Sequence, residues 1–552
     1  MSAFLIANMA PIMFASLVII LLLGYPAAFS LGAVGLIYAF VGIELGEFRP
    51  DFLRALPERV YGVMNNDTLL AIPFFTFMGL VLERSGMAED LLDTIGQLFG
   101  TIRGGLAYAV VFVGALLAAT TGVVAASVIS MGLISLPIML RYGYDRRMAT
   151  GIIAASGTLA QIIPPSLVLI VMADQLGKSV GDMYEGAFIP GLVLAGLYAF
   201  YAFLVTLIFP KAAPGLPPDA IGFREKDGSR GLASLGVLFF ASIVFGWFMM
   251  RHSESHGADF VVLSMFFGIL FAFFAAVVNW IIDKLTGFRF LSAMAQQTTF
   301  VMVPPLFLIF LVLGTIFIGI ATPTEGGAMG AAGAIILGAA KRRLSWDLIR
   351  QATESTAKLS AFVVFILVGA RVFSLTFYGV NGHVWVEHLL TSLPGGQIGF
   401  LIFVNAFVFI LAFFLDFFEL AFIIIPLLGP AAEKLGIDLI WFGVILGVNM
   451  QTSFMHPPFG FALFYLRSVA PKESYIDRVT GKRMDPVTTG QIYWGAVPFV
   501  VIQVIMVLLV ILFPAMVMHY KGAASTIDPN SIKIDIPQMD LPPLDFGPPP
   551  KN

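Results

Sequence analysis

The stretch that decides the fold occurs twice, once in each half of the chain. Residues 145–166 read DRRMATGIIAASGTLAQIIPPS, and residues 438–459 read DLIWFGVILGVNMQTSFMHPPF. Each copy starts at an Asp, continues as an apolar helix, and is interrupted at the same distance by a double proline, Pro164-Pro165 or Pro457-Pro458. A proline inside a helix removes one hydrogen bond and clashes with the preceding turn. We therefore predict two matching broken helices.

Further matches keep the same order around these two copies. The glycine pair Gly104-Gly105 precedes the first copy, and Gly395-Gly396 precedes the second. The segment GYPAAFSLGAVG at 24–35 is similar to GIATPTEGGAMG at 319–330, and Pro137 and Gly143 correspond to Pro430 and Gly436. We interpret the two halves as an internal repeat.

The composition places these helices in a bilayer. Apolar residues make up 59% of the chain and charged residues 12%, against about a quarter charged in an ordinary soluble domain. The net charge of -3 and the lack of a long basic cluster argue against a nucleic-acid partner. The chain has no Cys, which excludes disulfides and thiolate catalysis. No basic residue precedes Arg49, so we interpret the first apolar run as a span and not as a cleavable signal peptide.

Apolar runs of about 18–25 residues predict the spanning helices. We place them near residues 6–23, 26–43, 66–84, 145–175, 187–209, 231–250, 258–281, 299–320, 324–341, 357–378, 437–467 and 490–515. Two longer stretches, 104–140 and 396–430, are broken near the middle, and each is either two spans or one re-entrant hairpin. Three amphipathic stretches are expected to rest on the bilayer surface between spans: 49–62, 87–100 and 345–357.

Basic residues favour the hairpins. With the N-terminus outside and both stretches folded as hairpins, about two thirds of the 31 Lys and Arg residues face the cytoplasm. Full spans would turn the basic loops at 211–230, 284–289 and 341–350 outward. We therefore expect a multi-pass protein of the bacterial inner membrane with periplasmic N- and C-termini. An odd number of spans then separates the repeats, which inverts the second one.

The expected fold is thus an all-α polytopic membrane protein with two inverted repeats, each containing a re-entrant helical hairpin and a broken helix. Secondary transporters use this plan and bind their ligands near the midplane. We divide the chain into a first repeat with the following span (1–209), an inserted loop with two extra spans (210–296), a second repeat with the final span (297–515) and a Pro-rich tail (516–552).

The breaks and the hairpin tips are the candidate sites, because backbone groups freed at membrane depth need a partner. Freed carbonyls and hydroxyls suit Na⁺, and helix N-termini suit an anion. The alternative is that Pro and Gly only kink packed helices. Candidates along the substrate path are Thr120, Ser166, Asp416, Glu419 and His456. Asp416 and Glu419 are either functional carboxylates or a structural pair, and His456 either titrates or packs.

At these motifs the chain resembles the large membrane subunit of tripartite ATP-independent periplasmic (TRAP) transporters, DctM-like. The resemblance rests on IPFFTFMGLVLERSG at 72–86, GGLAYAVVFVGALLAATTGVVAAS at 104–127, GIATPTEGGAMG at 319–330 and both double-proline stretches. The two extra spans are similar to the longer branch labelled mannitol/chloroaromatic-type.

This resemblance implies a Na⁺-coupled elevator symporter, not an enzyme, with no cofactor besides the coupling ion. It implies a periplasmic substrate-binding protein that delivers an organic acid, and a small four-span membrane subunit. The Na⁺ sites that it implies are Thr121, Gly122, Val123, Gly157, Thr158, Pro164, Thr452, Ser453 and Pro457. The chain departs from the family where Val123 replaces a Ser and His456 replaces a Thr. A stand-alone Na⁺/anion symporter without a receptor is the alternative.

Overall fold

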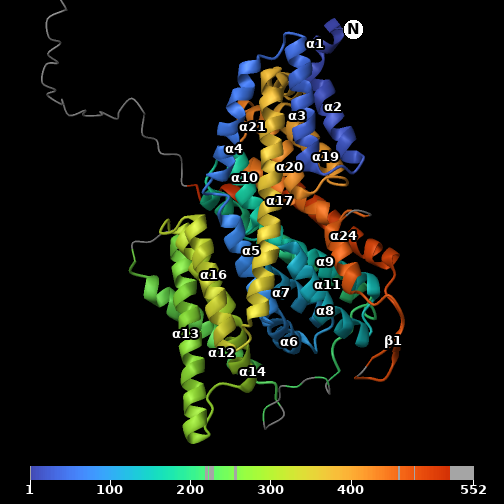
Figure 1. Cartoon of the computed structure of the whole chain (residues 1–552). Coiled ribbons are helices and arrows are strands. Elements are labelled where there is room, and N and C mark those ends of the chain that lie inside the picture. The colour runs from blue at the N-terminus through green and yellow to red at the C-terminus, as the bar shows by residue number, and fades with distance from the viewer. Residues whose placement is uncertain are drawn as a thin grey trace, which may run out of the picture.

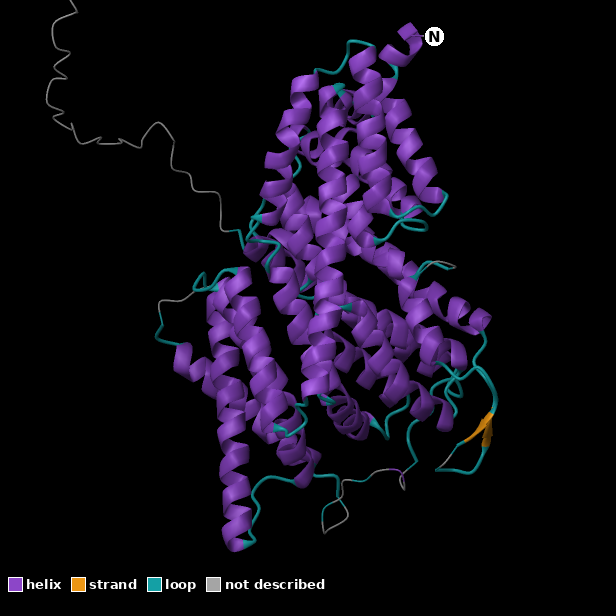
Figure 2. Ribbon diagram, in the orientation of Figure 1, coloured by secondary structure: helices purple, strands orange, loops and turns teal. Residues whose placement is uncertain are grey.

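The computed structural model describes residues 2–217, 220, 222, 225, 229–253, 258–457, 460–477 and 479–521. Nearly all regular structure in these residues is helical (Figures 1 and 2). One antiparallel strand pair, β1 (Tyr475–Ile476) and β2 (Arg483–Met484), closes a loop with Tyr475 opposite Met484. The expected all-α class is confirmed. Most of the predicted tail, residues 522–552, lies outside the described part.

The first half starts with α1 (Ser2–Ala7) and α2 (Met9–Leu22) and then contains the first repeat. The repeat consists of α3 (Ala27–Glu44), η1 (Pro50–Ala55), α4 (Leu56–Met64), α5 (Ala71–Arg84), α6 (Met87–Phe99), α7 (Gly105–Thr121), α8 (Val124–Arg141), α9 (Arg146–Thr158), η2 (Leu159–Gln161), α10 (Leu167–Leu176) and α11 (Val180–Ile208).

The second repeat follows the same order. It consists of α16 (Pro323–Ala340), α17 (Trp346–Gly379), α18 (Gly382–Thr391), α19 (Gly396–Leu411), α20 (Phe417–Ile423), α21 (Ile425–Lys434), α22 (Leu439–Met450), η5 (Gln451–Phe454), α23 (Phe461–Val469), α24 (Thr489–Leu512) and the short α25 (Ala515–Met518). Asp145 caps α9 and Asp438 caps α22 with the same pair of backbone hydrogen bonds, so the shared Asp starts each broken helix.

The inserted segment forms α12 (Leu232–Met250) and α13 (Ala258–Thr286) between the repeats. These helices pack on α14 (Ala293–Ile309), which continues through the π-helical segment η4 (Phe310–Gly314) into α15 (Thr315–Phe317). Helix α14 in turn packs on α6 and α7, and therefore joins the inserted helices to the body of the protein (Figure 1).

Helices of each repeat pack against helices of the other repeat. Helix α3 packs along α17, and its counterpart α16 packs along α5, the counterpart of the later part of α17. Gly35 permits the first contact, because a Cβ there would lie 3.0 Å from the Phe373 backbone. Gly327 permits the second, where a Cβ would lie 3.0 Å from Phe74. Reciprocal packing of this kind is expected from two repeats related by a two-fold axis.

Eight helices of the described residues are long and apolar enough to cross a bilayer. One predicted boundary is wrong: 345–357 is not a separate surface helix but the first part of α17, which runs unbroken for 34 residues. Its N-terminal polar residues continue one helix with the apolar ones, and neither Gly nor Pro interrupts them. In the first repeat the corresponding region is divided into α4 and α5.

Candidate functional site

The tip of the first hairpin lies against the first helix break. Helix α7 ends at Gly122, which has φ +57°, and α8 begins after the extended Val123. A Cβ on Gly122 would lie 3.1 Å from the Pro165 carbonyl oxygen, inside the break. The hairpin therefore turns back at the depth where the broken helix is interrupted, as the hairpin prediction requires.

The arm of this hairpin also touches the end of α9. A Cβ on Gly157 would lie 2.3 Å from Val128 Cγ2 and 3.2 Å from the Val128 backbone. The structure thus brings the predicted ion residues Gly122, Val123 and Gly157 to one interface. Thr121 ends α7, and its side chain lies outside the described part.

Three predicted hydroxyl groups near this interface donate hydrogen bonds to nearby carbonyls. Thr120 donates to Leu117 at 2.9 Å, and Thr158 donates to Ala155 at 2.8 Å. Ser166 donates to the Gln161 carbonyl, and its oxygen also caps α10 by accepting from Leu169 N. Ser166 therefore bridges the gap left after η2, next to Pro164. A hydroxyl that donates one bond keeps two lone pairs. Those of Thr158 already accept from Gln451 Nε2 at 3.0 Å and from Gln503 Nε2 at 3.5 Å.

The second break is also closely packed. Thr452 donates to the Asn449 carbonyl at 2.6 Å, and Ser453 lies buried in η5. The His456 ring is 1% exposed and stacks on Phe413 at 4.0 Å between centroids, with Phe409 edge-on at 4.5 Å. Within the described residues, neither ring nitrogen of His456 has a hydrogen-bond partner. Pro457 is the last residue of its described stretch, and Pro458 lies outside it.

The two carboxylates at the second hairpin tip form a capping box. Asp416 accepts from Glu419 N at 2.8 Å, and Glu419 accepts from Asp416 N at 3.0 Å. Both bonds satisfy backbone N–H groups at the start of α20. Between the two interpretations left open by the sequence, the geometry supports the structural pair.

A polar contact joins the two breaks directly. Gln451 Nε2 donates to Thr158 Oγ1 at 3.0 Å. Each residue lies six positions before the first proline of its own break, so the two are equivalent under the repeat. Residues related by a two-fold axis can touch only where the axis passes between them. Close to this contact, Gln503 Nε2 of α24 donates a hydrogen bond to the Tyr198 hydroxyl at 3.0 Å.

A cavity of about 370 Å³ borders the first hairpin tip and the first break. Its lining comes from α5, α17, α20 and α23 as well as from α8 and α10. The residues that give it polar character are Thr76, Glu83, Arg84, Gln161, Ser355 and Tyr465. Of the predicted residues, Gly122 and Val123 line the cavity, and the five substrate-path candidates do not.

Two helices begin at this cavity. Val124, Ala125 and Ala126 in the first turn of α8 line it, and so do Leu167 and Val168 of α10. No side chain caps α8. The first backbone N–H groups of a helix lack intrahelical partners and carry partial positive charge. These N–H groups and Arg84 offer positive charge to an anion, and the carboxylate of Glu83, which accepts from Ser130 at 3.0 Å, also lines the cavity.

Side chains that were not selected from the sequence complete the cavity. Arg84 Nη1 donates to Gln351 Oε1 at 2.7 Å, which holds its guanidinium at the cavity wall. Within the described residues, Thr76 Oγ1 and Gln161 Oε1 are buried without hydrogen-bond partners. Gln161 lies inside the double-proline stretch, so its position next to a break could have marked it as a candidate site residue. Nothing in the sequence around Thr76 could have marked that residue in the same way.

Comparison with known proteins identifies the family. Residues 14–516 match the family described as tripartite ATP-independent periplasmic transporter, DctM component. The chain belongs to this family. As a TRAP large permease it is a secondary-transporter component of the inner membrane, and TRAP transporters work with a periplasmic binding protein and a small membrane subunit.

Several curated TRAP permeases are similar to this chain. The C4-dicarboxylate TRAP transporter large permease protein DctM of Pseudomonas aeruginosa is 27% identical over 76% of this chain and 82% of that protein. The ectoine permease TeaC of Halomonas elongata is 23% identical over 94% of this chain and 100% of that protein. The isethionate permease DctMQ of Oleidesulfovibrio alaskensis is 24% identical over 83% of this chain and 60% of that protein.

Proposed function

We propose that this permease imports an organic acid by Na⁺ symport, with the cavity of about 370 Å³ as the substrate site. The observation that carries the proposal is the meeting of two helix N-termini and Arg84 around that cavity. The volume lies within the range of small-molecule pockets, roughly 300–1,000 Å³. The names of the curated relatives, which include a C4-dicarboxylate and a sulfonate permease, support an acid as the substrate class.

The proposed Na⁺ sites lie at the two breaks. In the first half, Gly122 at the tip faces the Pro165 carbonyl, and Thr158 ends the helix before the break. In the second half, Thr452 and Ser453 lie at the corresponding break. Carbonyl and hydroxyl oxygens are hard ligands, and they are the donors that the backbone offers here. An ion at the first break would hold the hairpin tip in place beside the substrate cavity.

The proposed mechanism is an elevator movement. The pairs α3–α17 and α5–α16 pack against each other across the repeats, which suits a fixed scaffold. The hairpins and broken helices line part of the cavity and form the axis contact, which suits a body that moves as one unit. Thr76, Arg84 and Ser355 line the cavity from the scaffold helices α5 and α17. A periplasmic binding protein and a four-span subunit complete the proposed transporter, and the termini face the periplasm.

Reconstitution tests the proposal. Liposomes would contain the permease with its small subunit and receptor, and the assay would measure uptake of labelled organic acids, beginning with succinate. We expect uptake of at least one acid only with an inward Na⁺ gradient and all three proteins present. Uptake that persists in choline at a constant proton gradient would disprove Na⁺ coupling. Uptake by the permease alone would favour the stand-alone Na⁺/anion symporter.

A further inference from the structure

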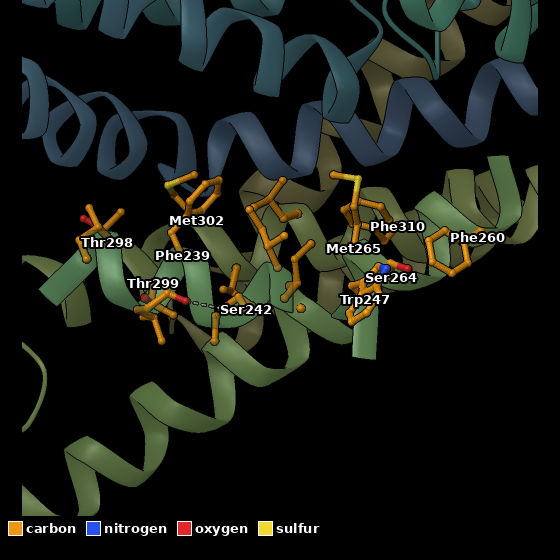
Figure 3. Close-up of a pocket in the computed structure, with 18 residues that line it drawn as sticks. Phe239, Ser242, Trp247, Phe260, Ser264, Met265, Thr298, Thr299, Met302 and Phe310 are labelled. Atoms are coloured by element: carbon orange, nitrogen blue, oxygen red, sulfur yellow. Dashed lines mark hydrogen bonds between the residues drawn. The ribbon is translucent and has the colours of Figure 1, made fainter. Parts of the chain in front are cut away.

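We propose that the groove between α12, α13 and α14 binds one acyl chain of a membrane phospholipid, with the phosphate of the headgroup next to Arg251. The groove shares no lining residue with the substrate cavity and is formed mainly by the inserted helices α12 and α13. Its volume is about 450 Å³. Figure 3 shows its side chains, with Thr298 and Thr299 at one end and Trp247 and Phe260 at the other.

The dimensions of the groove fit one extended chain. It is lined from Leu235 to Trp247 on α12, from Phe260 to Ala272 on α13 and from Thr298 on α14 to Phe310, the first residue of η4. At about 1.5 Å per residue each path is about 18 Å long, close to one leaflet of a hydrocarbon core about 30 Å thick. A volume of about 450 Å³ over that length gives a mean cross-section of about 25 Å².

A narrow path of this length suits an extended chain better than a helix, which is about 10–12 Å wide with its side chains. No charged residue lines the groove, so an apolar chain can enter without desolvating an ion. A helix of the small subunit that covers the groove is the competing occupant.

Four hydroxyl groups line the groove. Ser242 donates to the Leu238 carbonyl at 2.7 Å and Thr299 donates to Ala295 at 2.7 Å, as hydroxyls in apolar helices commonly do. Ser264 Oγ and Thr298 Oγ1 are both buried and have no partner within the described residues. Ser264 lies at the same end as Trp247, and Thr298 lies at the other end (Figure 3). An ester carbonyl of a lipid beside Ser264 would accept its hydrogen bond.

The same end of the groove carries a cation. Arg251 lies one helical turn beyond Trp247 and therefore follows the same face of α12. Its guanidinium carbon lies 4.2 Å from the centroid of the Phe248 ring, and its Nε donates to His252 Nδ1 at 3.2 Å. Trp and Arg at a helix end are typical of the headgroup region. At this end of the groove, Arg251, Trp247 and the Ser264 hydroxyl follow the order phosphate, interface and ester.

Photocrosslinking in the intact complex tests this site. The permease with its small subunit would be placed in vesicles of phosphatidylethanolamine with a minor share of phosphatidylglycerol that carries a diazirine in its acyl chain. We expect the label to concentrate on peptides from α12, α13 and α14. Ala272→Phe fills the groove and should reduce this labelling at least about fivefold, because close-packed apolar space cannot hold both groups. Val278→Phe, on the exposed side of α13, is the matched control.

The headgroup contact has its own pair of variants. Arg251→Gln should remove the preference for the phosphatidylglycerol probe over a phosphatidylcholine probe. Lys284→Gln should not, although Lys284 also lies over an aromatic ring, Trp280, because it is at the other end of α13. Thermal unfolding would confirm that each variant is folded. If Ala272→Phe does not fold, the wild-type protein is labelled in the presence of excess unlabelled phosphatidylglycerol. Labelling of α12, α13 and α14 should then fall, and unchanged labelling would overturn the proposal.

Three results would overturn the proposal. The label could be spread evenly over all lipid-facing helices, or it could remain unchanged in a folded Ala272→Phe variant. Alternatively, the label could appear only without the small subunit, with crosslinks from that subunit to Trp247 in the complex. The last result would show that protein, not lipid, covers the groove.

Discussion

The two halves share one topology, but they hold their hairpins in different ways. In the first half the close contacts are made at glycines, Gly122 against Pro165 and Gly114 against Ser156, where a Cβ would lie 2.6 Å from Ser156 Cβ. In the second half, Asn405 takes the place of Gly114, nine residues after the glycine pair, and Asn449 takes the place of Ser156. Asn449 Nδ2 donates to Asn405 Oδ1 at 2.9 Å and to its carbonyl at 2.8 Å.

The two hairpin tips also differ in how their polar groups are bonded. The second tip has a capping box of Asp416 and Glu419, and the second break is packed by His456 between two Phe rings. The first tip has no side-chain cap at α8 and borders the large cavity. The second tip also reaches this cavity, through Phe417 and Phe418 of α20. The difference is that side chains cap the first N–H groups of α20, whereas no side chain caps those of α8.

The largest expected effect concerns the inversion itself. Gly143 and Gly436 are equivalent under the repeat, are exposed, and close their own hairpins. In this Cys-free chain, a single Cys at 143 should react with impermeant maleimide only from the cytoplasm, and one at 436 only from the periplasm. Labelling of both from the same side would disprove the inverted relationship.

Gly122→Ala should strongly reduce Na⁺-driven uptake. The substitution places a Cβ 3.1 Å from the Pro165 carbonyl and costs about 1–2 kcal/mol of backbone strain. Gly177→Ala is the matched control, because Gly177 also has a positive φ, but its Cβ would meet no atom within 4 Å. Equal losses in the two variants, measured as uptake per folded complex, would mean that strain alone is responsible.

Gly157→Val should act differently from Gly122→Ala. The added side chain would overlap Val128, so we expect a lower yield and a lower unfolding temperature as well as loss of uptake. Size-exclusion profiles and thermal unfolding of the purified complex measure this. A variant with normal stability that has lost only its Na⁺ response would place the ion closer to Gly157 than we propose.

Breaking the amide pair should lower stability more than changing its counterpart. Asn449→Ala leaves the buried Asn405 carboxamide oxygen without its donor, which costs about 1–3 kcal/mol. Ser156→Ala should have little effect, because the Ser156 hydroxyl has no partner in the described residues. Thermal unfolding of both variants measures the difference, and similar shifts would show that the second half is not held more tightly.

Ser453→Ala should have the smallest effect. It removes one of several oxygens near the proposed second ion site, and we expect the half-saturating Na⁺ concentration to rise about three- to tenfold, equivalent to roughly 1 kcal/mol. Uptake measured against Na⁺ concentration on folded complex tests this. An unchanged value would move the second ion away from η5.

Much of this architecture could be predicted from local patterns. The Asp-to-double-Pro spacing located both broken helices, and the glycine pairs located both hairpins. The sequence TPTE at 322–325 is typical of a helix start, and Thr322 and Glu325 form a capping box at the start of α16. Local signals of this kind depend on backbone chemistry within one turn.

The cavity could not be predicted in the same way. Arg84, Thr76 and Gln161 meet there from elements separated along the sequence, and a single sequence contains no distance between them. Asp416 and Glu419 attracted attention because charge is rare in apolar segments, yet their bonds are made to their own backbone. The continuous α17 was misjudged because its polar first turns resemble a surface helix.

The contact between Thr158 and Gln451 has a mechanical consequence. Because the two breaks meet at a buried hydrogen bond on the symmetry axis, neither half can slide relative to the other without exposing an amide or a hydroxyl to an apolar interior. Under the proposed elevator mechanism, the coupling ion and the solute would therefore move together with both breaks, and sliding would take place where the scaffold helices contact the hairpins and broken helices.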